Sequence, residues 1–237
     1  MFDLKNIVFL DIETVPQHAH YHELSSEFKK IWDKKAERID ANTDSATLYE
    51  QKAGIFAEYG KVITISLGFF SHTEGELQFR TKTLVNDDEQ LLLTEFVQLA
   101  SKKFSKKKYR FCAHNGKEFD YPYLCRRMII NQIPLPSILQ LMGKKPWNVH
   151  HLDTLELWKF GDYKHYTSLE TLSVIFGIES SKKEIDGSQV ASVYYHEQGL
   201  DRIAKYCTQD VIATARIFLH YYGLGQLKNE HIIRIKD

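Results

Sequence analysis

An apolar run near the start of the chain, Ile7 to Leu10, leads directly into two alternating acids, Asp11 and Glu13. The run is β-branched and aromatic, which is the pattern of a strand buried on both faces of a sheet. Because strand side chains repeat with period two, the two carboxylates point to the same face. Two acids on one face repel each other unless a cation lies between them. Taken alone, the pair is better explained as the solvated end of a strand, because D-x-E also occurs at Asp87 and Glu89, where the macrodipole of a helix N-terminus accounts for the acids.

The rest of the chain predicts a single α/β domain. Strands are expected at residues 61–70, 76–85 and 109–113, with a hairpin turn at 72–75. Asn86 or Asp87 is expected to cap a helix that runs to about Phe104, and further helices are expected over 121–131, 168–176, 188–198 and 200–222. Residues 17–60 are polar, with apolar residues at helical spacing, which predicts a helical insertion. No repeat or Gly/Ser linker marks a boundary, so residues 1–237 are expected to form one domain with a mostly helical C-terminal part.

Composition argues against several classes of protein. The chain has 31 Lys plus Arg and 31 Asp plus Glu, and a net charge of zero argues against binding nucleic acid through overall positive charge. The three cysteines form no C-x-x-C pair, so neither a disulfide framework nor a zinc knuckle is indicated. No apolar run approaches the roughly 18–20 residues that span a bilayer, and acids come too early for a signal peptide. We therefore expect a cytoplasmic protein that does not engage a membrane.

Two further segments place acids at the ends of predicted elements. In FCAHNGKEFD a buried strand is followed by Asn115 and then by Asp120 at the start of a helix, where a simple helix cap is an equally good interpretation. In AKYCTQDV the i, i+4 spacing stacks the Tyr206 phenol and the Asp210 carboxylate on one helix face. Of the thirteen tyrosines, only Tyr206 has an aspartate four residues later. These two segments add an Asp, and a Tyr with an Asp, to the first pair of acids.

Together the three segments resemble the exonuclease motifs of the DEDD 3′–5′ exonuclease superfamily: Asp11-x-Glu13, Asn115 to Asp120, and Tyr206-x-x-x-Asp210. The tyrosine in the third motif resembles the DEDDy branch, whereas the histidine branch would place a histidine at the position of Lys205. Over about residues 5–222 the chain is most similar to predicted exonucleases related to the proofreading domain of family B DNA polymerases. The resemblance implies a ribonuclease H-like fold, in which a mixed β-sheet is flanked by α-helices.

The resemblance also implies which residues carry the chemistry. The catalytic residues would be Asp11, Glu13, Asp120, Tyr206 and Asp210, with the four carboxylates as metal ligands. Asn115 and Phe119 would contact the substrate. Mg²⁺ and Mn²⁺ prefer carboxylate and water oxygens, so four carboxylates suffice for two divalent cations. Two such cations about 4 Å apart stabilise both the attacking and the leaving oxygen of a phosphodiester. Tyr206, with an unperturbed pKa near 10, would orient the attacking water rather than deprotonate it.

These implications predict a metal-dependent 3′–5′ exonuclease that hydrolyses phosphodiester bonds at the 3′ end of single-stranded nucleic acid, with DNA favoured. Two alternatives stay open. One is a 3′–5′ exoribonuclease of the same fold, since RNA and DNA differ by a 2′-OH whose contacts the sequence does not place. The other is a nuclease fold that binds nucleic acid without cleaving it. The expected partners are single-stranded DNA or RNA 3′ ends, while a homo-oligomer and a replication or repair partner are both left open.

Several other polar groups have simpler explanations. The basic run from Lys102 to Arg110 contains no acid, but a solvated helix end is its favoured interpretation. The pairs Lys144/Lys145 and Lys182/Lys183 fit either a solvated surface or a phosphate path.

Histidines and the end of the chain are equally ambiguous. The pattern His18-x-His20-x-His22 fits Zn²⁺ or Ni²⁺ chelation, although a solvated cluster is favoured. His114 is expected to be structural rather than an acid or base. The segment Glu230–Ile235 fits an added edge strand or a subunit contact.

Overall fold

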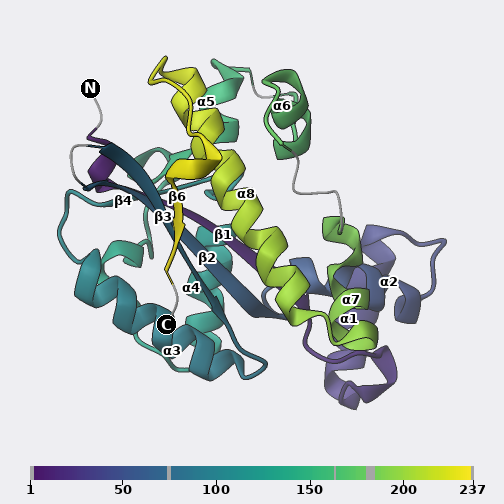
Figure 1. The fold of residues 1–237 in the computed structure, drawn as a ribbon. Helices are drawn as coiled ribbons and strands as arrows, with labels where there is room; N and C mark the ends of the chain where they lie inside the picture. The colour runs from purple at the N-terminus through teal and green to yellow at the C-terminus, as the bar shows by residue number, and fades with distance from the viewer. Residues whose placement is uncertain (1–2, 74–75, 163, 180–184, 236–237) are drawn as a thin grey trace.

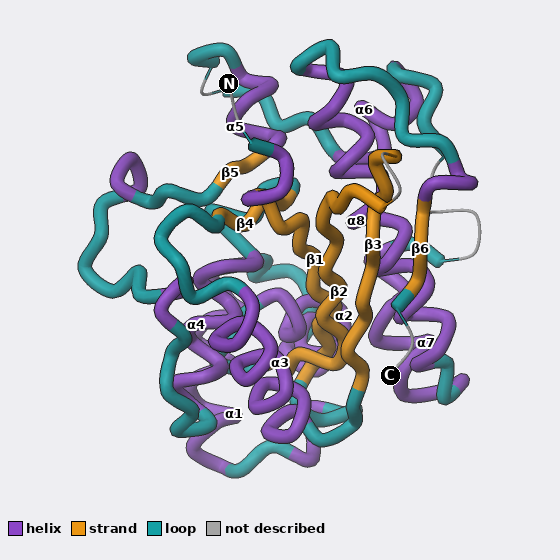
Figure 2. Tube along the Cα trace, turned by 60° about the vertical axis from the view of Figure 1, so that its left-hand side comes forward, coloured by secondary structure: helices purple, strands orange, loops and turns teal. Residues whose placement is uncertain are grey.

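The computed structural model describes residues 3–73, 76–162, 164–179 and 185–235. Within them a six-stranded sheet has the order β5-β4-β1-β2-β3-β6, which Figure 2 shows from one edge to the other. β1 pairs with β2 in antiparallel and with β4 in parallel orientation, so it lies inside a mixed sheet. The strands are β1 (Ile7–Pro16), β2 (Gly60–Thr73), β3 (Glu76–Val85), β4 (Arg110–Ala113), β5 (Leu152–Asp153) and β6 (Ile232–Arg234).

Helices cover both faces of this sheet. α8 crosses one face, while α3 and α4 cover the other, and α1, α2 and α7 gather at one end of the molecule (Figure 1). The helices in the described part of the chain are α1 (Ser26–Ile39), α2 (Ser45–Lys52), α3 (Glu89–Lys103), α4 (Asp120–Ile130), α5 (Thr154–Lys159), α6 (Leu169–Ile175), α7 (Val190–Glu197) and α8 (Leu200–Tyr221). None of them is both long and apolar enough to cross a membrane.

β1 divides the core into two layers. Val8, Leu10 and Ile12 pack into the cluster that includes residues of α3 and α4. Ile7 and Phe9 pack on the other side, with residues of α8. The strand is therefore buried on both faces, as its β-branched and aromatic run predicts.

One glycine lets α8 lie close to the sheet. A Cβ built on Gly68 of β2 would lie 2.7 Å from Cγ1 of Val211 and 2.3 Å from the Phe79 ring. No real side chain tolerates such distances without movement of its neighbours. Gly68 therefore sets how closely α8, which carries Tyr206 and Asp210, approaches β1 and β2.

The predicted elements are present, with shifts at their ends. β3 has the expected bounds, β2 extends to Thr73, and residues 74–75 of the expected turn lie outside the described residues. Four of the predicted helices correspond to α3, α4, α6 and α8 within two residues, and the predicted helix at 188–198 is α7 preceded by a 3₁₀ turn at Gly187–Gln189. The segment between residues 17 and 60 contains α1 and α2, as its apolar spacing predicts. The ribonuclease H-like α/β architecture is confirmed.

Three expectations need correction. β1 continues to Pro16, so Asp11 and Glu13 lie inside the strand rather than beyond its end. The N-cap of α3 is Asp88, whose carboxylate accepts the backbone N–H groups of Gln90 and Leu91. Glu89 lies in the first turn of α3, where the helix macrodipole alone would favour an acid, but it is buried and serves an ion pair instead.

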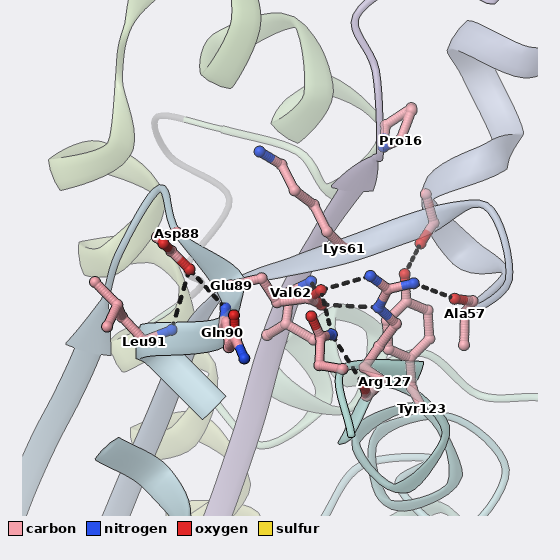
Figure 3. Close-up of polar contacts among 12 residues, drawn as sticks. Pro16, Ala57, Lys61, Val62, Asp88, Glu89, Gln90, Leu91, Tyr123 and Arg127 are labelled. Atoms are coloured by element: carbon pink, nitrogen blue, oxygen red, sulfur yellow. Dashed lines mark hydrogen bonds and ion pairs between the residues drawn. The ribbon is translucent and has the colours of Figure 1, made fainter. Parts of the chain in front are cut away.

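Glu89 and Arg127 form a buried ion pair that joins α3 to α4 (Figure 3). Glu89 Oε1 accepts the Arg127 Nε–H at 2.8 Å and the backbone N–H of Val62 at 2.7 Å. Arg127 also donates to the carbonyl oxygen of Ala57 at 2.8 Å, which lies just before β2. Each charge is thus paired and hydrogen-bonded, the condition under which a buried pair is tolerated. The pair fixes α4 relative to α3, β2 and the end of the 17–60 segment.

Two short strands were not assigned in advance. β5 and the following α5 occupy the segment HLDTLELW, and β5 pairs in parallel with β4. β6 pairs in parallel with β3 at the far edge of the sheet. Of the two interpretations offered for Glu230–Ile235, an edge strand is the one observed.

Candidate active site

β1 presents two carboxylates to the sheet face that α8 covers. Asp11 and Glu13 pair across the sheet with Ser66 and Thr64 of β2, and the register shifts directly after Glu13. Glu13 is buried and Asp11 is half-buried. One oxygen of each carboxylate lies within 4.8 Å of the other, as expected for side chains on one face of a strand.

α8 adds a tyrosine and a third carboxylate to the same face. Tyr206 and Asp210 are one helical turn apart, and burial and the nearby Asp210 carboxylate raise the pKa of the Tyr206 phenol. Asp210 is 8% exposed, and its charge raises the pKa of both Asp11 and Glu13. The i, i+4 spacing therefore places phenol and carboxylate together against the β1 acids.

The fourth carboxylate enters from the opposite layer of helices. The last pair between β4 and β1 joins Cys112 to Phe9, so beyond Phe9 this edge of β1 has no strand partner within the described residues. The start of α4 occupies that edge, and the backbone N–H of Ile12 donates to the carboxylate of Asp120. Asp120 is 3% exposed and is the first residue of α4. Because β4 is short, the first residue of α4 can reach the sheet face that α8 covers.

A buried aspartate that sequence reasoning did not select holds the turn before α4. Asp153 accepts the backbone N–H groups of Asn115 at 2.9 Å and Lys117 at 3.0 Å. It also accepts the N–H of Leu155 at 2.9 Å, which caps α5. One carboxylate thus ties the turn before Asp120 to the neighbouring strand and helix. An Asp followed by T-L-E is an N-cap pattern, and this was the available signal.

Burial and mutual repulsion make the acids hard to ionise. Burial raises the pKa of Asp11 and Glu13 well above their ordinary values, and the charges of Asp210 and Asp120 add to the shift. Burial also raises the pKa of Asp120 to about 8, although the hydrogen bonds from its own N–H and from Ile12 oppose that rise. In the absence of a cation, this cluster therefore holds protons at a pH where exposed acids have lost them.

The Tyr206 phenol is held in its protonated form. Its pKa is raised by burial and further by the negative charges of Asp210, Glu13 and Asp11. Its hydroxyl therefore acts as a hydrogen-bond donor at neutral pH. A protonated phenol at this position can donate a hydrogen bond, which fits a role in orientation rather than as a base.

Cys207 is a second residue that sequence reasoning left out of the site. Its sulfur lies within 4.8 Å of one oxygen of Asp11 and one oxygen of Glu13. The thiol donates to the backbone carbonyl of Asp11 at 3.4 Å, and burial raises its pKa well above the ordinary value. It is thus a neutral contact between α8 and β1 rather than a thiolate. Its position directly after Tyr206 in Y-C-T-Q-D was the only signal in the sequence.

The two predicted substrate residues lie in the turn and at the start of α4. Asn115 has a left-handed backbone with φ of 62°, and its carbonyl oxygen accepts the N–H groups of Glu118 and Phe119. Phe119 is half-buried and its ring lies 5.3 Å from that of Tyr123. Both residues adjoin Asp120, and their contact with substrate stays a prediction.

His114, His20 and His22 have contacts that account for them without a metal or a catalytic role. The two ring nitrogens of His114 lie 2.9 Å from Thr154 Oγ1 and 2.9 Å from the Thr167 carbonyl oxygen, as expected for a structural histidine. His20 bonds Glu50 at 2.9 Å and stacks on the ring of His22. Within the described residues, these histidines form no group of three donor atoms close enough to hold a metal.

The basic segments separate in space. The run from Lys102 to Lys108 precedes β4, whereas the turn with Asn115 follows β4, so the run lies at the opposite end of that strand from the acids. Lys144 lies in the loop between α4 and β5, next to the turn before Asp120. Lys182 and Lys183 lie outside the described residues.

A mixed sheet with acids converging on its central strand defines a ribonuclease H-like α/β fold with a buried carboxylate site. The model of one protein family, described as predicted 3′–5′ exonucleases related to the exonuclease domain of PolB, matches residues 55–235. The chain therefore belongs to this family, and nucleic acid is the substrate class that membership implies. Asp120, Tyr206 and Asp210 lie within the matched residues, while Asp11 and Glu13 precede them. No curated protein matches the chain.

The residues at this site fit divalent cations. The Asp11 Oδ2 atom is buried and has no hydrogen-bond partner among the described residues, although a carboxylate oxygen in such a place normally has one. Four carboxylates supply the hard oxygen ligands that Mg²⁺ and Mn²⁺ require. A bound cation would also offset the repulsion that raises the pKa values of Asp11, Glu13 and Asp120.

Proposed function

We propose that this protein is a metal-dependent 3′–5′ exonuclease of the DEDDy type, acting on the 3′ end of single-stranded nucleic acid with DNA preferred. The proposal rests above all on the convergence of four carboxylates and one tyrosine from β1, α4 and α8. Family membership supports the reaction class. Buried acids that lie this close together repel one another, and a bound cation offsets that repulsion.

The four acids divide into two sets of ligands in this proposal. Asp11, Glu13 and Asp210 would hold one cation, and Asp11 and Asp120 would hold a second. When bound, the cations stabilise charge on the phosphoryl and leaving oxygens and lower the pKa of the attacking water. The hydrogen bonds from Asn115 and Lys117 to Asp153 hold the turn that fixes the position of Asp120.

Tyr206 orients the attacking water. Its hydroxyl remains protonated because buried acids surround it, so it acts through a hydrogen bond rather than by taking a proton. Its i, i+4 spacing from Asp210 on α8 places the phenol on the helix face that covers the β1 acids. The proposal thus gives positioning to Tyr206 and electrostatics to the carboxylates.

The test is a time course on 5′-labelled single-stranded DNA and RNA of matched sequence, with Mn²⁺ and with EDTA. We expect a ladder that shortens from the 3′ end of DNA faster than of RNA and that disappears in EDTA. Asp210→Asn should lose the activity and retain the fold. Asp201→Asn is the matched control, because Asp201 lies on the same helix and is exposed.

The outcomes separate the alternatives. A ladder only on RNA would replace the DNA preference with an exoribonuclease. Binding of labelled strands with no shortening of DNA or RNA in Mn²⁺ or Mg²⁺ would overturn the hydrolytic proposal in favour of a binding module. Full activity of Asp210→Asn would contradict the assignment of the ligands.

A further inference from the structure

A groove opens along the outer face of α4, beside the turn that precedes Asp120. Its volume is about 550 Å³, and it begins at Lys117 and Glu118 within that turn. Tyr121, Pro122 and Cys125 continue its wall along the first turns of α4. The loop between α4 and β5 forms the facing wall. The groove therefore adjoins the candidate active site.

The lining of the groove is mainly apolar and partly open to solvent. It includes Ile129, Leu135, Leu141, Met142, Pro146 and Val149. Met142 is 77% exposed, and Trp147, next to Pro146 in the chain, is 75% exposed. Exposed apolar surface gathered in a concave site marks a binding surface more often than scattered single residues do.

The rim of the groove has a small excess of positive charge. Lys117, Arg126 and Lys144 contribute positive charge, against Glu118 and Glu156. Lys117 is paired with Glu156 at 2.5 Å. The neighbouring Lys145 adds a further cation, whose ammonium group lies 5.3 Å from the centre of the Trp147 ring. An apolar floor with a basic rim and an exposed aromatic residue is the arrangement that binds bases and phosphates of an unpaired strand.

We propose that this groove binds unpaired nucleotides of the same strand whose end lies at the carboxylate cluster. The inference rests on the proposed function and deepens it by assigning the upstream part of a single-stranded substrate. Asp120 faces β1 and the groove lies on the outer side of α4, so roughly one helix diameter, about 10 Å, separates them. A strand that crosses the turn beside Phe119 reaches the groove within a few nucleotides. Bases lie against the apolar floor and Trp147, and phosphates lie along Lys144, Lys145 and Arg126.

The chain offers a matched control for the charge in this proposal. Lys106 and Lys107 are exposed, as are Lys144 and Lys145. They lie before β4, at the opposite end of that strand from the active site. Reversing either pair changes the net charge equally, so a difference between the two variants reports position rather than overall charge.

The first measurement is binding of a 5′-fluorescent single strand by anisotropy in Ca²⁺, over a range of salt concentrations. Lys144→Glu/Lys145→Glu should weaken binding by about 10-fold or more. It should also flatten the slope of log K against log salt by about 1.4, because each phosphate that a lysine neutralises contributes about 0.7 to that slope. Lys106→Glu/Lys107→Glu should bind as the unaltered protein does. Trp147→Ala should also weaken binding by about 10-fold, because one base no longer stacks on an indole ring.

Hydrolysis separates this inference from the proposed function. The groove variants should cleave a dinucleotide, which occupies only the carboxylate site, at the normal rate, and should cleave a long oligonucleotide more slowly. Equal binding by the two lysine variants would overturn the groove proposal, whatever the hydrolysis shows. Quenching of Trp147 fluorescence by an amphipathic peptide but not by the oligonucleotide would also overturn it, and would assign the groove to a protein partner. Failure of the unaltered protein to cleave the dinucleotide would instead count against the proposed function.

Discussion

Gly187 borders the Tyr206 hydroxyl, although no motif marks it. A Cβ built on Gly187 would lie 3.8 Å from the Tyr206 hydroxyl oxygen, which is ordinary contact distance. Gly187 is not among the glycines with positive φ, so its backbone does not require glycine. Asp186 caps the 3₁₀ turn Gly187–Gln189, and Ile185 before it is buried. These contacts hold the backbone of Gly187 beside the Tyr206 hydroxyl. Among the described residues, the absence of a side chain at Gly187 therefore leaves space beside the hydroxyl to which we assign the orientation of the water.

We predict that Gly187→Leu reduces hydrolysis roughly 100-fold, the scale that displacement of a reacting group by about 1 Å produces. Gly187→Ala should stay close to normal, because its methyl group meets the phenol only at contact distance. Both variants should show the same thermal stabilisation by Mn²⁺, since no ligand changes. Normal turnover by Gly187→Leu would show that hydrolysis does not depend on the space beside the Tyr206 hydroxyl.

Tyr206→Phe tests the division of roles within the site. We predict that kcat falls roughly 100-fold while KM is retained, because a misplaced nucleophile affects the chemical step. Since burial and neighbouring acids raise the pKa of Tyr206, the pH profiles of the two proteins should have the same shape up to about pH 9. A pH limb that is lost in Tyr206→Phe would show that the phenol titrates during turnover.

At the scale of elements, α4 is held at two levels. Its N-terminus is held by the turn bonded to Asp153, and its last turn by the buried pair of Arg127 with Glu89. Tyr123 adds a bond from its hydroxyl to the Gly54 carbonyl oxygen at 2.8 Å (Figure 3). The helix therefore has a fixed register against the sheet, and Asp120 at its first position inherits that register.

Arg127→Met should destabilise the protein by about 3–5 kcal/mol, because it leaves Glu89 buried without its partner. Glu89→Gln/Arg127→Met should recover much of that loss, since a glutamine oxygen can still accept the Val62 N–H and no buried charge remains. Urea unfolding of the two variants measures both values. The interpretation fails if the double variant is less stable than Arg127→Met alone.

The sequence predicted the features that a local pattern decides and missed those that depend on tertiary contacts. The strand before Asp11 and the Tyr206–Asp210 spacing are local patterns, and both were predicted. The end of β1 was not, because the polar Asp11 and Glu13 break the apolar run although the strand continues through them. Glu89 looked like a helix-end acid, and only the fold brings Arg127 to it from 38 residues away. Cys207 and Asp153 were missed for the same reason, since their partners lie on other elements.

At the scale of the whole molecule, the acid cluster couples stability to pH. The pKa of Asp120 is about 8 in the folded chain and about 4 when unfolded, so the folded state holds a proton that the unfolded state has released. The stability that this proton provides is present at low pH and is lost as the pH rises through the folded pKa. Asp11 and Glu13, whose pKa values are also raised, act in the same direction.

We therefore predict that, in EDTA, the free energy of unfolding falls as the pH rises from about 6.5 to about 8, with a limit of about 1.4 kcal/mol per pH unit for each proton. Buried His151, whose pKa is lowered to about 4, opposes this fall at about pH 6.5, where an unfolded histidine still binds a proton; its effect fades by about pH 7.5, so the fall should be steepest between about pH 7 and 8. Asp120→Asn should reduce the slope, and saturating Mn²⁺ should remove it. A flat profile in EDTA would contradict the assigned protonation of the cluster.

The contact between Cys207 and Asp11 spans 196 residues of sequence. β1 is made among the first residues of the chain, but α8, which covers its acidic face, is made among the last. During synthesis at the ribosome, Phe9, Phe70 and Phe79 of the α8 layer therefore lack their helical cover until residue 221 has emerged. The nascent chain exposes this aromatic sheet face until α8 has been made, and until then Tyr206 and Asp210 are absent from the acid cluster. The cluster is therefore complete only after α8 has folded, so products truncated before α8 carry the exposed face without the assembled site.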